Sequence, residues 1–512
     1  MALVTVPTTG EFGLVADQPA QELPVNAWSR VENVRFRGGR AERVGGHQLI
    51  FDAPSVTPYH LVTYEVAGLR YVVHCGLASV FADNGTARSN ITGTAPTGSA
   101  TDRWTSCVLN GVLVLNNGKD TPSYWAGTGT LASLPGWNSA WKCRSMGAFK
   151  AYLVAFGITK SGTEYPHMVK WSHFADPGAV PASWDEADET KEAGEVDLAE
   201  TTDQAVDMLP LGDANILYKQ RSMYAMRFIG GTQIFEFRKL PGNFGMLAKG
   251  CAASTPKGHV VLANGDIVIH DGVSEPQSIV TDRLKETLFQ LELDADNSDK
   301  CFVVANPARS EVWICYPKVG SSVCDAALIW NWDSNTWGRR DLPNVTHATS
   351  GVITYTAADS FDSGGDETFD EDYALFNQDE FGPTESRLLL ASTAPALYIA
   401  DSSSSFAGSP IYAVLERTGL AFDDAELVKT IRSMVPRFTA PPGSTLYITF
   451  GSSMDAEGAV AWGERIPYIT GTTRKADSFA TGRFLAVRIE SEGGPKWSLK
   501  SYTADIVPRG LN

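Results

Sequence analysis

The sequence predicts an all-β protein whose central part is a β-propeller. The segment 301–343 divides into four short strands with a turn between each pair. Similar strand and turn units recur along much of the chain, and no long stretch shows the 3.6-residue apolar period of a helical protein. One four-stranded sheet cannot bury both of its faces alone, but a ring of such sheets can, which favours a propeller.

The four predicted strands of segment 301–343 differ in their patterns. Residues 302–305 are apolar, and residues 311–316 alternate, which places Val312, Ile314 and Tyr316 on one half-buried face. Residues 326–331 form a continuous apolar run typical of a strand inside a sheet. Residues 336–340 are more polar and predict the outer edge of the sheet. Turn residues such as Asp and Asn separate the strands.

The same pattern predicts further blades elsewhere in the chain. Asn110-Gly111 and Asn264-Gly265 are hairpin signals between apolar strands. The spacing is loose, roughly 35 to 50 residues, which indicates structural repetition without sequence repetition. A seventh unit is completed near 348–401. Residues 51–401 are therefore predicted to form a propeller of about six or seven blades, with the other units at 61–84, 104–125, 148–171, 216–237, 260–269 and 301–343.

The propeller is predicted to lie between an N-terminal arm, residues 1–50, and a C-terminal β-sandwich, residues 402–512. The C-terminal part follows a serine-rich linker and contains short alternating strands. The N-terminal part carries a dense basic patch, of which Arg35, Arg37, Arg40 and Arg43 are the candidate interface residues. Two interpretations stay open: an edge hairpin with solvated arginines, or an arm that docks on an acidic neighbour.

Two acidic stretches, 176–203 and 359–385, interrupt the strand pattern and predict loops that project from the ring. The second has no Lys or Arg, yet it contains five aromatic residues. These aromatic residues either form a gate with symmetry mates or anchor the loop on its own blade. The candidate gate residues are Phe361, Phe369, Tyr373, Phe376 and Phe381.

Residues 282–293 predict the one amphipathic helix of the chain. Leu284, Leu288 and Leu291 are expected on one face, and Asp282 is expected to cap the first turn.

Composition argues against several classes of function. The formal net charge of −17 is the reverse of what a protein that grips nucleic-acid phosphates needs. The seven cysteines form no C-x-x-C pair and are expected to be buried thiols of a reducing compartment. The start of the chain has no signal-peptide pattern, and no apolar run has the length of a membrane span.

The sequence shows no pattern that predicts an enzyme. Nucleophile-elbow, zinc-protease, phosphate-loop and dinucleotide motifs are absent from the sequence, and the eight histidines are dispersed. We therefore expect no catalytic residues, no cofactor and no metal. A pair of carboxylates for glycoside hydrolysis stays open, because a propeller brings distant residues together at its centre.

Three segments, 33–46, 327–343 and 462–510, resemble the tail nozzle proteins of short-tailed bacteriophages, which are also called tail hub or packaged-DNA stabilisation proteins. The resemblance implies a non-enzymatic virion protein, made in the cytoplasm of the host bacterium. It further implies a homohexameric ring below the portal and adaptor, with possible tail fibre or spike partners. The ring would retain the packaged DNA, contact it passively and conduct it during ejection. The two acidic stretches depart from the family pattern.

The negative charge agrees with a conduit for DNA, because an acidic channel wall repels the duplex and adds little friction. Two alternatives come from other classes of protein. One is a glycan-binding or glycan-cleaving propeller. The other is a general protein-interaction propeller, for which we expect a monomer with one exposed apolar face.

Overall fold

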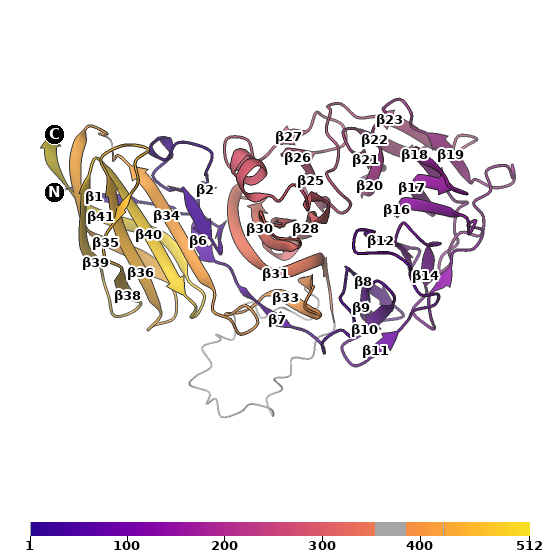
Figure 1. Ribbon diagram of the computed structural model, residues 1–512, viewed down its shortest axis with the longest axis horizontal. Helices are drawn as coiled ribbons and strands as arrows, with labels where there is room; N and C mark the ends of the chain where they lie inside the picture. Colours follow the sequence, from indigo (N-terminus) through magenta and orange to yellow (C-terminus); the bar gives the residue numbers. More distant parts are fainter. Residues whose placement is uncertain (1, 354–385, 423, 512) are drawn as a thin grey trace.

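The computed structural model describes residues 2–353, 386–422 and 424–511, and these residues are mainly β-strands (Figure 1). Within them, five separate four-stranded antiparallel sheets follow one another along the chain. Their strands are β8 (His60–Val66), β9 (Leu69–Cys75), β10 (Val80–Asp83) and β11 (Arg88–Asn90); β12 (Thr105–Leu109), β13 (Val112–Asn116), β14 (Ser123–Trp125) and β15 (Ala132–Ser133); β16 (Trp141–Phe149), β17 (Tyr152–Lys160), β18 (Thr163–Trp171) and β19 (Gly194–Asp197); β20 (Ala205–Leu211), β21 (Ala214–Lys219), β22 (Met223–Phe228) and β23 (Phe235–Lys239); β24 (Ala252–Thr255), β25 (Gly258–Ala263), β26 (Asp266–His270) and β27 (Gln277–Ser278).

The next strands belong to a larger sheet. β28 (Phe302–Asn306), β29 (Glu311–Tyr316) and β30 (Cys324–Asn331) lead into the long strand β31 (Thr336–Gly351). The first part of β31 pairs with β30, and its last part pairs with β32 (Arg387–Ser392). β32 then pairs with β33 (Ala396–Ser403), and β33 pairs with β7 (Gly46–Leu49). A strand from the N-terminal part of the chain thus completes this group.

The first strands of the sheets lie around a common centre (Figure 1). β8, β12, β16, β20, β24 and β28 contact one another in this order, and β31 contacts both β28 and β8. The ring is therefore closed within the described residues. The predicted all-β, propeller-like architecture is confirmed at this level.

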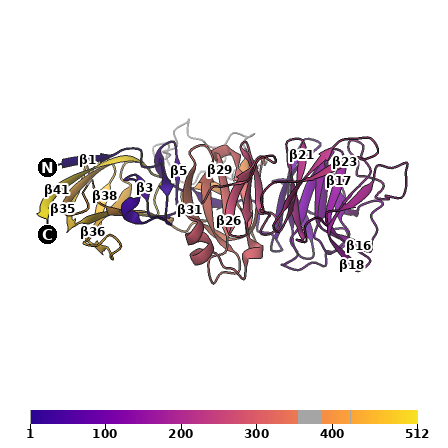
Figure 2. The ribbon, with the colours of Figure 1, turned by 90° about the horizontal axis from the view of Figure 1, so that it is seen from above.

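A second unit lies beside the propeller and contains two layers of strands, the remaining strands of the large sheet that includes β28 to β31 and a separate six-stranded sheet (Figure 2). They bury one shared core, to which Leu415, Ile448 and Val487 contribute from one sheet and Ile431 and Leu499 from the other. The large sheet contributes β35 (Leu427–Thr439), β39 (Ala476–Gly482), β41 (Ser498–Leu511), β1 (Ala2–Val6), β5 (Val34–Arg37) and β6 (Arg40–Arg43) to this unit. The six-stranded sheet contains β34 (Tyr412–Leu420), β36 (Thr445–Ser453), β37 (Ala461–Trp462), β38 (Ile466–Ile469), β40 (Phe484–Glu492) and β4 (Arg30–Glu32).

Residues 1–50 do not form the predicted extended arm, although the hairpin of the alternative interpretation is present as β5 and β6, which turn at Gly38-Gly39. β1 and β6 pair with β41, and β4 pairs with β34. The short strands β2 (Gly13–Leu14) and β3 (Ala27–Trp28) pair with each other, and β2 also touches β31. The segment is incorporated because its apolar residues, including Val31, Val34 and Phe36, are buried in the core shared by both units.

Segment 301–343 has the four strands predicted for it, but two details of the prediction are wrong. Every residue of β29 is buried, so Glu311–Tyr316 has no half-exposed face. β31 is not an outer edge, because β5 pairs beside it and Arg340 is buried. The polar residues of 336–340 include Arg339 and Arg340, which form ion pairs inside the protein. In the sequence alone, such residues cannot be distinguished from those of a solvent-exposed edge strand.

The acidic stretch 176–203 is partly packed on its own sheet, although residues 185–187 and 189–191 are exposed, as expected for a loop. It follows β18 and contains β19, and the ring of buried Trp184 lies 4.7 Å from that of Trp137. Glu195 pairs with Lys170 at 3.0 Å and with Lys160 at 2.5 Å. These lysines come from β17 and β18 and compensate the acidic charge. The stretch 359–385, with Phe361, Phe369, Tyr373, Phe376 and Phe381, lies outside the described residues.

The predicted helix is shorter than expected, and its N-terminus is capped by a residue from the N-terminal part of the chain. Its regular part is η2 (Thr287–Glu292). Leu284 and Leu288 are buried, but Leu291 is 72% exposed. Asp17 replaces the predicted cap, because its carboxylate accepts the Glu286 and Thr287 N–H groups at 2.8 and 2.9 Å. The other short helices are η1 (Ala20–Glu22), η3 (Ser298–Lys300) and η4 (Pro307–Arg309).

All seven cysteines are free thiols and six are buried, as predicted; Cys107 is half-buried. Among the described residues, no group of three or more His, Cys, Asp or Glu side chains is placed to hold a metal ion. No helix in the same part of the chain is long and apolar enough to cross a membrane.

Candidate functional site: a buried joint between two β units

The three sequence segments 33–46, 327–343 and 462–510 meet at one place in the structure. β5 and β6 form a hairpin, and Val34 of β5 pairs with Arg339 of β31. On the other side of this hairpin, Ala41 of β6 pairs with Leu499 of β41. Because β31 belongs to the propeller and β41 to the second unit, the N-terminal hairpin connects the two. We refer to this region as the joint.

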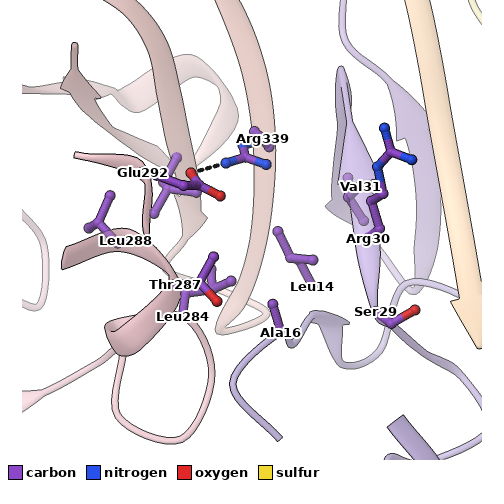
Figure 3. Close-up of a pocket in the computed structure, with 11 residues that line it drawn as sticks. Leu14, Ala16, Ser29, Arg30, Val31, Leu284, Thr287, Leu288, Glu292 and Arg339 are labelled. Carbon is purple, nitrogen blue, oxygen red and sulfur yellow. Dashed lines mark ion pairs between the residues drawn. The ribbon is translucent and has the colours of Figure 1, made fainter. Parts of the chain in front are cut away.

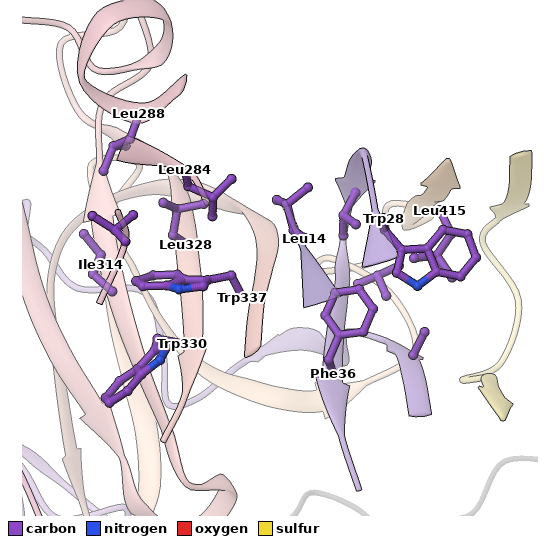
Figure 4. Close-up of a cluster of buried hydrophobic side chains, with 14 of the residues drawn as sticks. Leu14, Trp28, Phe36, Leu284, Leu288, Ile314, Leu328, Trp330, Trp337 and Leu415 are labelled. Carbon is purple, nitrogen blue, oxygen red and sulfur yellow. The ribbon is translucent and has the colours of Figure 1, made fainter. Parts of the chain in front are cut away.

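The joint has a continuous apolar core (Figure 4). Trp337 and Leu328 on the propeller side belong to the same buried cluster as Phe36, Trp28 and Leu415. The indole N–H groups are satisfied by backbone carbonyls, at 3.0 Å for Trp337 and 2.7 Å for Trp28. Each fully buried large apolar side chain contributes about 1.5–3 kcal/mol, so this core holds the two units together strongly.

Close backbone approach adds to the fit of the joint. Gly338 lies against β5, where a Cβ atom would be 2.5 Å from the Val34 carbonyl oxygen. Gly45 approaches Asp401 equally closely, and a Cβ there would be 2.7 Å from the Asp401 Cα. Any larger residue at either position must displace backbone. The glycines of the two sequence motifs are therefore required by packing.

A buried ionic cluster lies inside the joint. Arg35 donates to Asp401 at 2.5 and 2.8 Å and to Glu311 at 3.1 and 3.2 Å. Arg340 and Arg309 approach the same Asp401 carboxylate, each at 3.3 Å. The Arg35, Glu311 and Asp401 side chains are only 0% to 3% exposed. Three elements far apart in sequence are thereby tied together.

The charges of this cluster stabilise one another. Burial alone would lower the pKa of Arg35, but Asp401 and Glu311 raise it above its ordinary value. Burial likewise opposes ionisation of Asp401, yet the guanidinium groups of Arg35, Arg340 and Arg309 hold its pKa well below the usual range. Arg35 and Asp401 therefore both stay ionised throughout the neutral pH range. Removing one partner from such a cluster leaves a buried charge unpaired, which costs about 3–5 kcal/mol.

The predicted interface arginines have two different fates. Arg35 and Arg43 are buried inside the chain, so they are not available for a partner, and the prediction is wrong for both. Arg43 donates to the Ser404 and Gly493 carbonyls, and burial lowers its pKa to about 10. Arg37 and Arg40 are exposed beside the hairpin turn, and within the described residues neither forms an ion pair. These two stay candidates for an interface.

Sequence reasoning missed the acidic partners of Arg35. Glu311 begins an otherwise apolar strand, and Asp401 follows a buried run in β33. A lone carboxylate inside a continuous apolar run is a usable signal, because such a charge is buried only with a partner. Arg35 is separated from Glu311 by 276 positions in the sequence and from Asp401 by 366 positions, so this pairing could not be predicted without the fold.

A cavity of about 250 Å³ adjoins the joint (Figure 3). Its wall is mainly apolar, and it includes Leu14, Val31 and Leu288. Arg339 and Glu292 form an ion pair on one side. Glu292 also accepts a hydrogen bond from the Tyr316 hydroxyl at 2.6 Å. Arg30, the third charged residue of the wall, pairs with Glu32 and Glu416 outside the cavity, so each charged group of the wall already has an ion-pair partner.

A polar layer also surrounds the centre of the propeller. The Met146 N–H donates to Thr105 Oγ1 at 3.3 Å, which joins β16 to β12. Ser145 Oγ donates to Asp207 Oδ1 at 2.5 Å, and the Gly250 N–H donates to Asp207 Oδ2 at 2.9 Å. These bonds link β12, β16, β20 and the turn before β24 at one level.

Two histidines complete this axial layer. The Val303 N–H donates to the Gly250 carbonyl at 2.8 Å, which continues the layer to β28. On β31, the His347 ring lies 4.2 Å from that of His60 on β8. His60 Nε2 shares a hydrogen bond of 2.8 Å with Ser106 Oγ on β12. The layer therefore returns to the strand from which it started.

The axial histidines carry no charge at neutral pH. Burial, together with the nearby positive charge of Arg103, lowers the pKa of His60 to about 3. Burial and the same arginine also hold the pKa of His347 well below its usual value. Both imidazoles can therefore donate or accept hydrogen bonds, but neither balances or adds charge at the propeller centre.

No family model and no curated protein matches the sequence of this chain. Solved structures with a similar arrangement include Raptor of Chaetomium thermophilum, with a TM-score of 0.41 and 10% identity over 70% of this chain and 30% of that protein. PorZ, a surface component of the type-IX secretion system of Porphyromonas gingivalis, has a TM-score of 0.38 and 8% identity over 84% of this chain and 47% of that one. The Pan2 WD40 domain of Neurospora crassa has a TM-score of 0.35 and 9% identity over 68% of this chain and 90% of that domain. This chain thus spans less than half of the first two proteins.

Proposed function

We propose that this chain is a structural subunit of a short bacteriophage tail, part of a ring-shaped nozzle or hub that docks below the portal and adaptor, retains packaged DNA and conducts it during ejection. The observation that carries the proposal is the joint. The three segments that resemble tail nozzle proteins are distant in sequence, yet β5, β31 and β41 place them side by side. In this proposal the shared motifs specify how two β units are fixed together.

The proposal includes a finer description of the fold. We assign seven blades to the propeller, the seventh consisting of the last part of β31 with β32, β33 and β7. We assign the second unit as a β-sandwich that includes β1, β4, β5 and β6. Closing the ring with β7 ties the end of the propeller to the beginning of the chain, which resists opening of the ring under load.

A rigid joint suits a part that bears the pressure of packaged DNA. The core of the joint is continuous through the tryptophans Trp28 and Trp337. Its ion pairs are shielded from solvent, so salt screens them little. The two units would therefore transmit force as one body, and the proposed role needs no catalytic group.

An exposed apolar surface supports assembly into a ring. Leu3, Val435 and Phe479 lie on β1, β35 and β39, and their side chains are 73%, 43% and 77% exposed. They alternate with inward-facing residues such as Met434 and Ala480, so all three point to the outer face of one sheet. Exposed apolar residues gathered on one face mark protein interfaces more often than single ones do. We assign this face to contacts between copies of the chain.

The test is electron microscopy of the purified protein and of tails that contain it. We expect rings with sixfold symmetry, and we expect Phe479→Glu to abolish them. Val319→Glu is the matched control, since Val319 is 68% exposed on the propeller, away from that face. A single copy per tail, with a monomer in solution at every concentration, would overturn the proposal.

A general protein-interaction propeller is the second candidate, because the exposed apolar face also fits a partner of another kind. The two candidates differ in where the protein is found. A tail subunit should copurify with virions, whereas an interaction propeller should remain with soluble complexes of the cell. Immunodetection of the chain in purified virions separates the two.

A further inference from the structure

Three cationic side chains lie at the propeller centre without an acidic partner. Arg103 precedes β12, Arg144 lies in β16, and Lys249 precedes β24. All three are half-buried. Among the described residues, none of the three forms an ion pair closer than 4.0 Å, although most other half-buried cations of the chain do.

The hydrogen bonds of these cations leave donors free. Lys249 Nζ donates to the Arg103 carbonyl at 3.1 Å, and no other acceptor within the described chain takes its remaining protons. Arg103 Nη1 donates to the Asp299 and Cys301 carbonyls at 3.1 and 2.5 Å, which fixes the guanidinium but uses only one of its nitrogens. Arg144 makes a single long bond of 3.4 Å, from Nη1 to the Ala205 carbonyl.

The charges at this place do not balance. The carboxylate of Asp207 interacts electrostatically with Lys249, and its oxygens already accept from Ser145, Gly250 and the Met208 N–H. The neighbouring carboxylate of Asp102 lies 3.9 Å from Lys119. Asp102 also interacts electrostatically with Lys249, so three cations face two carboxylates, each of which already has other partners. Burial lowers the pKa of Lys249, and although Asp207 raises it, Arg103 and Arg144 lower it further.

The surroundings show that the cations are held in position. Gly118 packs under Lys249, where a Cβ atom would be 3.3 Å from Nζ. Arg103 lies over the Phe302 ring, 6.0 Å from its centre. The neutral histidines His60 and His347 lie within electrostatic range of Arg103 and add no charge. Positioned donors with unbalanced charge at the centre of a ring are what an anion site requires.

We propose that Arg103, Arg144 and Lys249 bind one tetrahedral oxyanion of the phosphate class at the centre of the propeller. A tetrahedral oxyanion offers several acceptors at once, so it can bridge groups that approach from β12, β16 and β24, whereas a carboxylate has only two oxygens. The anion supplies the negative charge that this part of the fold lacks. The inference does not depend on the proposed tail function. It also agrees with a net charge of −17, because it concerns one local site and not a surface.

The experiment is isothermal titration calorimetry of the full chain with inorganic phosphate, at constant ionic strength set by sodium chloride. We expect saturable binding of one phosphate per chain, and competition by sulfate but not by acetate. A parallel titration with adenosine monophosphate distinguishes the source. Equal or tighter binding assigns the site to the phosphate of a nucleotide, and weaker binding assigns it to the free ion.

Two variants and one control make the test specific. Lys249→Met and Arg144→Gln should each weaken phosphate binding about tenfold or more, as expected when one charged donor is lost. Arg227→Gln is the control, because Arg227 is exposed on β22 of the same propeller, and binding should not change. Circular dichroism checks that each variant is folded. Should one of them fail to fold, the other variant and the sulfate competition still decide. Absence of saturable binding to the folded parent, or unchanged binding in both folded variants, would overturn the proposal.

Discussion

The joint and the axial layer both bring charged residues together from distant parts of the chain, but they treat charge in opposite ways. In the joint, the carboxylates of Glu311 and Asp401 are bound by Arg35 and its neighbours, and the cluster is closed to solvent. In the axial layer, Arg103 and Lys249 are half-buried without ion pairs. Buried charges that are paired stabilise the fold. Half-buried charges without partners destabilise it, and a bound anion can remove this unfavourable free energy. The two should therefore respond oppositely to mutation.

The largest effect is expected from the joint. Asp401→Asn keeps the shape of the side chain but leaves Arg35 and Arg340 without their shared counter-charge. We expect the free energy of unfolding to fall by about 3–5 kcal/mol, measured by denaturation with urea. Asp213→Asn is the matched control, because Asp213 pairs with Lys150 at 3.1 Å but its side chain is 99% exposed. A loss below about 0.5 kcal/mol in Asp401→Asn would show that the joint does not depend on its charges.

A second change examines the packing of the joint and not its charge. Gly338→Ala places a Cβ atom against the Val34 carbonyl oxygen and forces β31 and β5 apart. We expect a loss of about 1–3 kcal/mol by the same measurement, which is typical of overpacking. Gly98→Ala serves as control, since its nearest neighbour would be at 3.4 Å, an ordinary contact. Equal stabilities of the two variants would mean that the strands separate freely.

The sequence predicted single strands and turns better than it predicted which strands pair with each other. The strands of segment 301–343 and the hairpin at Asn264-Gly265 followed from alternation and turn residues, which act over a few positions. The fate of residues 1–50 did not follow, because strand pairing between β6 and β41 is set by complementarity across more than 400 residues. Arg35 was expected to be solvated for the same reason, because its partners Glu311 and Asp401 are brought to it only by the fold.

The axial site was hidden from the sequence for a related reason. Arg103, Arg144 and Lys249 are isolated cations in three separate segments with no common motif. Their shared property is that each lies in, or within three residues of, the first strand of a sheet. Only a propeller brings such positions together. A propeller is expected to bring distant residues together at its centre, but the expected pair there consisted of carboxylates and not of cations.

The axial layer should become more stable when it loses a charge. Lys249 has its pKa lowered by burial, so the folded state binds its proton less tightly than the unfolded state does. Its charge therefore destabilises the fold at neutral pH, and this cost disappears as the pH rises toward the pKa of an unfolded lysine. In phosphate-free buffer we expect Lys249→Met to raise the thermal midpoint at pH 7 by a few degrees, and the difference from the parent should shrink as the pH approaches 10. A lower midpoint for the variant would place Lys249 with the structural charges of the joint.

The smallest effect on folding is expected at the tip of the joint hairpin, where the charged side chains are exposed to solvent and, among the described residues, are neither paired nor buried. Arg37 is exposed and has no ion pair in the described part of the chain. We expect Arg37→Glu to change the free energy of unfolding by less than about 0.5 kcal/mol, as is usual for exposed positions. If the tip docks on carboxylates of a neighbouring subunit or of the adaptor, the same reversal should slow ring assembly at low salt, because rim charges mainly set the rate of encounter. Light scattering during assembly measures this rate, and Arg227→Glu, an equal reversal on the propeller surface, is the control. An assembly rate equal to that of the control would restrict the role of the hairpin to its buried residues, leaving Arg35 and Arg43 as the reason for its basic sequence.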